Sequence, residues 1–242
     1  MPISSHAVVE TTSLGSNVDI GHFAVVAAGA TIGSDVVIHP HVVIGDGVTI
    51  ADGVEIFPGA FLGRVPKGAG ATARTPEFER RISIGAETSI GPNAVIYYDV
   101  VIGNNTLVGD GASIRERCRI GSYVIISRYV TLNYNATVGD RSKVMDMTHI
   151  TGNCTIGEDV FVSTGVSTMN DNAMGADGYD EAEVRGPTIE NGAMVGGAAT
   201  LLPRVVIGEG ALVAASSLVS RSVPAGSLVA GVPAREKRRL QP

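Results

Sequence analysis

An aliphatic residue recurs at every sixth position along most of this chain. The period runs through residues 14–62, resumes over 84–162 and returns over 189–219. A period of six fits neither the 3.6-residue turn of a helix nor the two-residue alternation of one long strand. It predicts short strands separated by turns, in which each hexad forms one side of a coil and the aliphatic side chain points inward.

The residues around each aliphatic position fit a narrow interior. Two positions earlier the side chain is usually small or β-branched, and one position later glycine is common. The 242 residues include 31 glycines and no tryptophan, and only 5% are aromatic, which suits a prism packed with small aliphatic side chains. This composition favours strands and turns. The hydrophobic fraction of 44% excludes a disordered chain.

The repeat is similar to that of the hexapeptide-repeat family. The resemblance implies an all-β fold, a left-handed parallel β-helix with three hexads in each coil, as a single domain over residues 1–242. Handedness comes from the resemblance alone, because the general preference for right-handed crossovers predicts the opposite. With rungs about 4.8 Å apart, Cys118 and Cys154 lie two coils apart in one column, about 9.6 Å, which is too far for a disulfide. Both are predicted to be small core residues.

Two segments interrupt the period. Residues 63–81 are rich in glycine, proline, alanine and basic side chains, and residues 170–187 are acidic and contain glycine. Inserted loops on one face of a solenoid are the usual place for binding. The alternative is that both are surface loops that the fold tolerates and that have no role in binding.

The C-terminal stretch resembles the last coils of acyl-coenzyme A dependent hexapeptide transferases. The matching features are a Val223-Pro224 turn and the segment Gly231-Val232-Pro233-Ala234-Arg235. The resemblance implies acetyl-coenzyme A, or another acyl-coenzyme A, as co-substrate. The alternative is an end cap over about residues 220–242 with a solvated tail.

A pantetheine arm that lies along a coil needs small side chains, so that backbone groups can reach it. Cationic groups near the end of the chain suit the coenzyme phosphates. The expected coenzyme contacts are therefore Gly197, Ala198, Ala215, Ser216, Arg221 and Arg235.

Acyl transfer needs an unprotonated nucleophile, and one group must usually accept its proton. Of the five histidines, only His149 falls in the middle coils near the second interruption. It directly precedes the inward Ile150 and is predicted to point outward. Stacking in steps of three hexads places Asn153, Asn170 and Asp171 in a polar cluster with His149. A ladder of hydrogen-bonded turns explains Asn135 and Asn153 equally well.

Two branches of the family resemble parts of this chain. Its N-terminal half is similar to the UDP-N-acetylglucosamine O-acyltransferases of lipid A synthesis. Those enzymes and the bacillosamine-type acetyltransferases carry a catalytic histidine in an H-D-C-x-[IV]-G motif. Here the corresponding segment is Gly152-Asn153-Cys154-Thr155-Ile156-Gly157, without that histidine. The activity of the lipid A enzymes is therefore not carried over.

The nucleotide-linked 3-amino-sugar N-acetyltransferases are more similar. Their D-D-V-F-x-G-P and F-T-N-D stretches resemble residues 158–164 and 168–171, with Ser163-Thr164 in place of G-P and the first aromatic residue lost. The resemblance implies that Asn170 orients the acceptor and that Asp171 attracts its amine, with His149 as the candidate base.

The resulting prediction is an N-acyltransferase that acetylates an amino group of a nucleotide-linked sugar. The family resemblance implies a homotrimer with three sites between adjacent prisms. The basic side chains of the first insertion are hypothesised to contact the acceptor diphosphate; they are Arg64, Lys67, Arg74 and Arg80. Three alternatives stay open: O-acyl transfer to a saccharide, N-acyl transfer of the tetrahydrodipicolinate type, and a non-catalytic scaffold.

Charge and composition argue against other classes. The net charge is -6 and no long basic run occurs, which speaks against nucleic acid. No apolar window approaches the length of a membrane-spanning helix, so no membrane span is expected, and without a signal-like start a cytosolic location is expected. No metal site is predicted, because His149 has no histidine partner in its own coil or the next.

Overall fold

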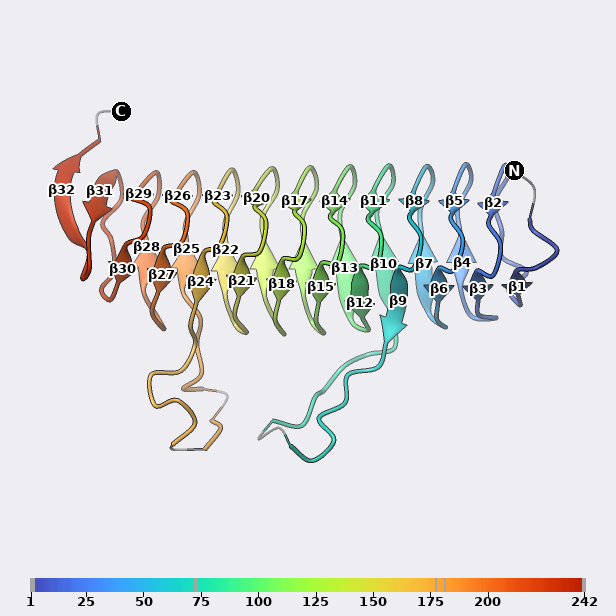
Figure 1. The fold of residues 1–242 in the computed structure, drawn as a ribbon, viewed down its shortest axis with the longest axis horizontal. Coiled ribbons are helices and arrows are strands. Elements are labelled where there is room, and N and C mark those ends of the chain that lie inside the picture. Colours follow the sequence, from blue (N-terminus) through green and yellow to red (C-terminus); the bar gives the residue numbers. More distant parts are fainter. Residues whose placement is uncertain (1–2, 72–73, 177, 181, 241–242) are drawn as a thin grey trace.

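Each hexad forms one short strand and one turn, and the strands stack in parallel into a long solenoid (Figure 1). The computed structural model describes residues 3–71, 74–176, 178–180 and 182–240. Each strand usually pairs with the third strand before or after it along the chain, as Thr131 pairs with His149 and Val95 with Ser113. Three consecutive hexads therefore make one coil, and the chain passes through three sheets in each coil.

The three sheets are called A, B and C, and the chain runs from A to B to C and back to A. Sheet A contains β1 (Val8–Val9), β3 (Val25–Val26), β6 (Val43–Ile44), β9 (Phe61–Arg64), β12 (Val95–Tyr97), β15 (Ser113–Ile114), β18 (Thr131–Leu132), β21 (His149–Ile150), β24 (Ser167–Thr168), β27 (Thr200–Leu201) and β30 (Leu218–Val219). Sheet B contains β4 (Thr31–Ile32), β7 (Val48–Ile50), β10 (Ile82–Ile84), β13 (Val100–Ile102), β16 (Arg119–Ile120), β19 (Thr137–Val138), β22 (Thr155–Ile156), β25 (Thr188–Ile189) and β28 (Val206–Ile207). Sheet C contains β2 (Asp19–Ile20), β5 (Val37–Ile38), β8 (Glu55–Ile56), β11 (Ser89–Ile90), β14 (Leu107–Val108), β17 (Ile125–Ile126), β20 (Lys143–Val144), β23 (Phe161–Val162), β26 (Met194–Val195), β29 (Leu212–Val213), β31 (Ser227–Ala230) and β32 (Arg235–Arg239).

The turns between the sheets form three corners, called A–B, B–C and C–A after the sheets they join. The prediction of an all-β parallel β-helix is confirmed, and its geometry is consistent with the left-handed winding that the resemblance implies. Strand β32 departs from the pattern, because it pairs antiparallel with β31 and covers the C-terminal end. Within the described ranges, no helix is long and apolar enough to cross a membrane.

The predicted inward direction of the aliphatic side chains is confirmed. Ile114, Ile126 and Ile150 are fully buried in the core. Cys118 and Cys154 are also buried and not joined, as their column positions predict. Thr168 also takes an inward position, where a polar residue stands in place of the aliphatic one, so the aliphatic period stops one strand earlier. The coil structure therefore continues up to the second interruption.

Both interruptions leave the solenoid from the A–B corner. The first loop, residues 63–81, follows β9, and the second loop, residues 170–187, follows β24 (Figure 1). In sheet A these strands are separated by β12, β15, β18 and β21. The turns that follow those four strands form the stretch of corner between the two loops.

Candidate functional site

His149 lies on the outer face of sheet A, in strand β21. Its neighbours on that face are Thr131 and Ser167, which pair with it from the adjacent coils. The imidazole Nδ1 lies 2.7 Å from Thr131 Oγ1. Behind the strand, the buried Thr168 hydroxyl donates to the His149 carbonyl at 3.1 Å and accepts from the Thr151 N–H at 2.8 Å. The ring and the backbone of His149 are thus both held.

The electrostatic setting of His149 suits a general base. The side chain is half-buried, and burial lowers its pKa below the usual 6.5 because the charged form loses solvation. The imidazole is therefore mainly neutral at pH 7. When Nδ1–H donates to Thr131, the Nε2 lone pair is left to accept a proton.

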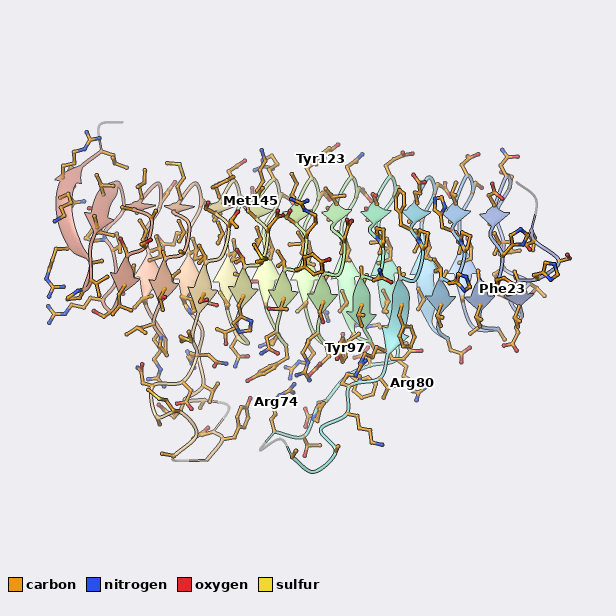
Figure 2. The ribbon with its side chains drawn as sticks, viewed as in Figure 1. Phe23, Arg74, Arg80, Tyr97, Tyr123 and Met145 are labelled. Carbon is orange, nitrogen blue, oxygen red and sulfur yellow. The ribbon has the colours of Figure 1, made fainter. Side chains whose placement is uncertain are left out.

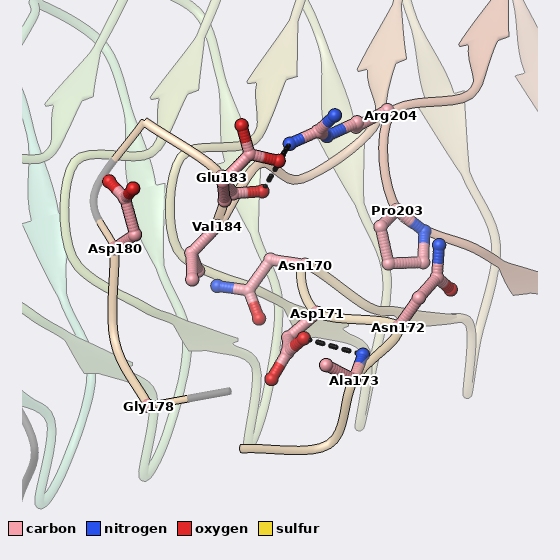
Figure 3. Close-up of a pocket in the computed structure, with 10 residues that line it drawn as sticks. All are labelled: Asn170, Asp171, Asn172, Ala173, Gly178, Asp180, Glu183, Val184, Pro203 and Arg204. Carbon is pink, nitrogen blue, oxygen red and sulfur yellow. Dashed lines mark hydrogen bonds and ion pairs between the residues drawn. The ribbon is translucent and has the colours of Figure 1, made fainter. Parts of the chain in front are cut away.

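A polar pocket of about 400 Å³ lies under the second loop (Figure 3). Its lining residues are Asn170, Asp171, Asn172, Ala173, Gly178, Asp180, Glu183, Val184, Pro203 and Arg204. The Asp171 carboxylate accepts from the N–H groups of Ala173 and Gly175, both at 2.7 Å. These bonds shape the start of the loop, so Asp171 has a structural role in addition to any role in binding.

The pocket carries more negative than positive charge. Arg204 pairs with the Glu183 carboxylate and also donates to its backbone carbonyl at 2.8 Å. Asp171 and Asp180 add two further carboxylates to the lining. A wall with an excess of carboxylates favours a cationic ligand such as a protonated amine.

The predicted polar cluster is only partly assembled. Asn170 donates to the Gly152 carbonyl at 3.3 Å. Asn153 accepts from Asn135 at 2.8 Å and donates to the Val184 carbonyl at 2.6 Å, as the ladder interpretation predicts. His149 does not line the pocket and faces outward from the neighbouring sheet surface.

The four small residues predicted to meet coenzyme A share one corner. Gly197 and Ala198 follow β26, and Ala215 and Ser216 follow β29, so they occupy successive turns of the C–A corner. The Ser216 N–H donates to the Gly197 carbonyl at 2.8 Å. The turn before Arg235 lies beside the start of β30, since the Ala234 N–H donates to the Leu218 carbonyl at 2.8 Å.

The two arginines predicted to meet the coenzyme phosphates lie apart from each other. Arg235 begins β32, beside the small residues, whereas Arg221 follows β30 at the A–B corner. Both side chains are exposed. A coenzyme lying along the C–A corner would therefore meet Arg235 directly, but it would meet Arg221 only across the end of sheet A.

The first loop makes contacts that periodicity does not reveal. Arg64 lies over the Tyr97 ring, with its guanidinium carbon 5.2 Å from the ring centroid. Arg74, labelled in Figure 2, extends from the first loop. It pairs with the buried Glu116 of the solenoid. Stacking in steps of three hexads aligns Glu116 with Tyr134 at the A–B corner. Exposed charged residues such as Asp110 and Arg128 occupy the same place in other hexads, so no signal in the sequence indicates this pairing.

Two family descriptions match parts of this chain. "Bacterial transferase hexapeptide (six repeats)" matches residues 11–46 and 29–64. "GMPPB C-terminal domain" matches residues 78–174. Together they extend from the first coils to the start of the second loop.

Curated relatives match over short stretches. Serine acetyltransferase 2 of Arabidopsis thaliana is 42% identical over 80 residues, which are 33% of this chain and 24% of that protein. A 2,3,4,5-tetrahydropyridine-2,6-dicarboxylate N-acetyltransferase of Staphylococcus aureus is 47% identical over 47 residues, 19% of this chain and 20% of that protein. The chain thus spans no more than about a quarter of these two relatives.

Solved structures match over almost the whole chain. The Arabidopsis UDP-N-acetylglucosamine acyltransferase aligns with 98% of this chain and 74% of its own, with a TM-score of 0.59 and 17% identity. The same enzyme from Campylobacter jejuni aligns over the same shares, with a TM-score of 0.51 and 19% identity. At these identities the likeness is one of fold.

Proposed function

The chain belongs to the hexapeptide-repeat transferase family, and we propose that it moves an acetyl or other acyl group from coenzyme A to an amino group of a nucleotide-linked sugar. The observation that carries this proposal is the placement of His149. Its half-buried imidazole has a lowered pKa, is anchored by Thr131 and faces outward from the middle of sheet A. A neutral imidazole in this position can accept a proton from an attacking amine.

The donor is proposed from two observations. The short stretches that match Serine acetyltransferase 2 and the tetrahydropyridine-dicarboxylate N-acetyltransferase both come from acetyltransferases. The four small residues at the C–A corner also leave a strip along successive coils without large side chains, as a pantetheine arm requires. Coenzyme A is therefore the proposed acyl carrier, with Gly197, Ala198, Ala215 and Ser216 along its arm and Arg235 near its phosphates.

The acceptor is proposed from the charges around the second loop. The excess of carboxylates in the pocket suits an amine better than a neutral hydroxyl. Asn170 and Asp171 line this pocket, in keeping with the proposed roles of orienting the acceptor and attracting its amine. The basic side chains of the first loop, Arg64, Lys67 and Arg80, suit the phosphates of a nucleotide-linked sugar.

The proposed reaction conserves atoms and charge. A bound ammonium group first loses one proton to solvent. The free amine then attacks the thioester carbonyl carbon, and a second proton passes from its nitrogen to His149 Nε2. The tetrahedral intermediate then breaks its carbon–sulfur bond, and the thiolate of coenzyme A leaves and takes the proton back from His149. The products are the N-acyl acceptor and free coenzyme A, and the enzyme is regenerated.

A homotrimer is proposed for the active form, with each site formed between adjacent prisms. In that arrangement a neighbouring subunit would complete the space around His149, which does not line the pocket of its own chain.

The proposal is tested by measuring thiol release from acetyl-coenzyme A with a panel of acceptors. The panel holds UDP- and dTDP-linked amino sugars, the matching hydroxy sugars, serine and tetrahydrodipicolinate. Turnover confined to amino sugars is expected. Turnover of hydroxy sugars would establish O-acyl transfer, and turnover of tetrahydrodipicolinate alone would establish that alternative.

The variant His149→Asn is expected to lower kcat by about 100-fold or more, the usual contribution of a general base. His41→Asn is the matched control, because it makes the same change at an exposed turn position of the C–A corner and is expected to retain full kcat. Equal activity of the two variants would remove His149 from the mechanism. Failure to bind acetyl-coenzyme A at all would favour the scaffold alternative.

A further inference from the structure

Glu116 is a buried carboxylate in the turn between β15 and β16. Its side chain is 0% exposed. Arg115 of the same turn donates to both carboxylate oxygens, at 3.1 Å each. Arg74, which is 42 residues earlier in the chain, donates from the first loop. A buried charge is costly unless it is paired and hydrogen-bonded, so this carboxylate depends on its two arginines.

The first loop follows the A–B corner across successive coils. Phe78 stacks on Tyr98 with the ring centroids 6.3 Å apart, and the Arg80 guanidinium carbon lies 5.6 Å from the centroid of the same ring. One coil further on, Arg74 pairs with Glu116. In the next coil Arg74 covers Tyr134, with its guanidinium carbon 3.8 Å from the ring centroid.

The loop is also tied at its base. The Tyr98 N–H donates to the Arg64 carbonyl at 3.1 Å, and the Asp99 N–H donates to the Arg81 carbonyl at 2.7 Å. The two ends of the loop are therefore fixed by backbone bonds. Away from these ends, Arg74 forms an ion pair with Glu116. Among the described residues of the loop, no other ion pair reaches a fully buried side chain of the solenoid.

The contact with Tyr134 brings the loop to the coil that carries His149. The Tyr134 ring packs on Gly152, where a Cβ atom would lie only 2.6 Å from the ring. Gly152 stands in the turn directly after β21, three residues beyond His149. Because Gly152 has no side chain, the Tyr134 ring can pack against its backbone. Arg74 covers the same ring.

We infer that Glu116 is a positioning residue, whose buried carboxylate fastens the first loop through Arg74 so that the loop forms a fixed wall beside the turn that follows His149. The assignment of this wall to the acceptor rests on the proposed function. The loop then holds Lys67, which lies between the fixed base at Arg64 and the attachment at Arg74, in place before the acceptor arrives. Fixing charged groups in advance lowers the entropy lost on binding.

The attachment of the loop is tested by limited digestion with trypsin. Arg185 is exposed in the second loop and serves as an internal reference, whereas the Arg74 side chain is 12% exposed and is held by Glu116 and Tyr134. In Glu116→Gln the rate of cleavage after Arg74, relative to that after Arg185, is expected to rise about tenfold, because local opening controls proteolysis. Glu87→Gln, at an exposed B–C turn, is the matched control and should leave the ratio unchanged.

The positioning role is tested by kinetics. Glu116→Gln, Arg74→Gln and the double variant are each expected to raise the acceptor KM by about tenfold, with no additivity because the two residues act as one unit. The KM for acetyl-coenzyme A and kcat at saturating acceptor should stay within about twofold of wild type, since the C–A corner is untouched. Arg74→Gln changes only a loop residue, and thermal melting of each variant checks that the solenoid is folded.

The possible results distinguish the fastening of the loop from its role in positioning the acceptor. An unchanged cleavage ratio in Glu116→Gln would overturn the fastening of the loop. A raised ratio with an unchanged acceptor KM, or with additive effects of the two variants, would overturn the positioning role. A raised ratio in a protein that transfers no acyl group to any acceptor would refute the proposed function and leave the fastening established.

Discussion

At the scale of single residues, His149 sets the pH dependence of the proposed reaction. Because burial lowers its pKa, the acidic limb of the kcat/KM profile is expected to have its midpoint below 6.5. The same shift lowers stability as the pH falls below about 6.5, since the unfolded chain binds the proton first. A pH profile of thiol release, compared with urea unfolding at the same pH values, checks both effects. A midpoint above 7 would contradict the assignment.

The two cysteines give a second prediction at this scale. Burial raises the pKa of the Cys118 and Cys154 thiols to about 12 each. Only the thiolate reacts readily with disulfide reagents, so neither residue is expected to react in the folded protein at pH 8. Titration with an aromatic disulfide should detect no thiol in the native chain and two after unfolding in guanidinium. Rapid reaction of one thiol in the native state would show that its coil opens.

At the scale of the elements, strand β17 offers a matched pair of isoleucines. Ile126 points inward and is fully buried, whereas Ile125 points outward and is half-buried. Ile126→Ala is expected to lower the free energy of unfolding by about 2–5 kcal/mol, because it removes buried methyl groups and leaves a cavity. Ile125→Ala should cost about 1 kcal/mol, in proportion to its smaller buried area. Urea unfolding of both variants checks the difference, and equal losses would contradict the inward register of the hexad.

The register of the strands could be predicted from the sequence because it is periodic. Once Ile150 is placed inward, His149 must face outward, and steps of three hexads place Thr131 and Ser167 beside it. The contacts of the loops could not be predicted in this way, since the loops have no period. The pairing of Arg74 with Glu116 joins residues 42 positions apart, and the bonds of Asp171 to its own loop depend on a local turn. The catalytic and coenzyme-binding roles of the predicted residues stay predictions.

At the scale of the whole molecule, the proposed homotrimer is open to direct measurement. Light scattering is expected to give about 75 kDa, three times the 24.9 kDa of one chain. Sites formed between prisms should also lose activity on dilution to the concentration at which the trimer dissociates, because each lacks its neighbour's surface. A chain that is monomeric at all concentrations and fully active would contradict this arrangement.

The common corner of the two loops has a further consequence. Strands β9 and β24 are five strand-to-strand steps apart in sheet A. At roughly 4.8 Å per step, the points where the two loops leave the solenoid lie about 24 Å apart. Adding or deleting one full coil between them would slide one loop along the axis by a single rung without turning it. A change of one hexad would instead rotate it to another face. The separation of the loops is thus quantised, and evolution or design can resize the space between them only in whole-coil steps.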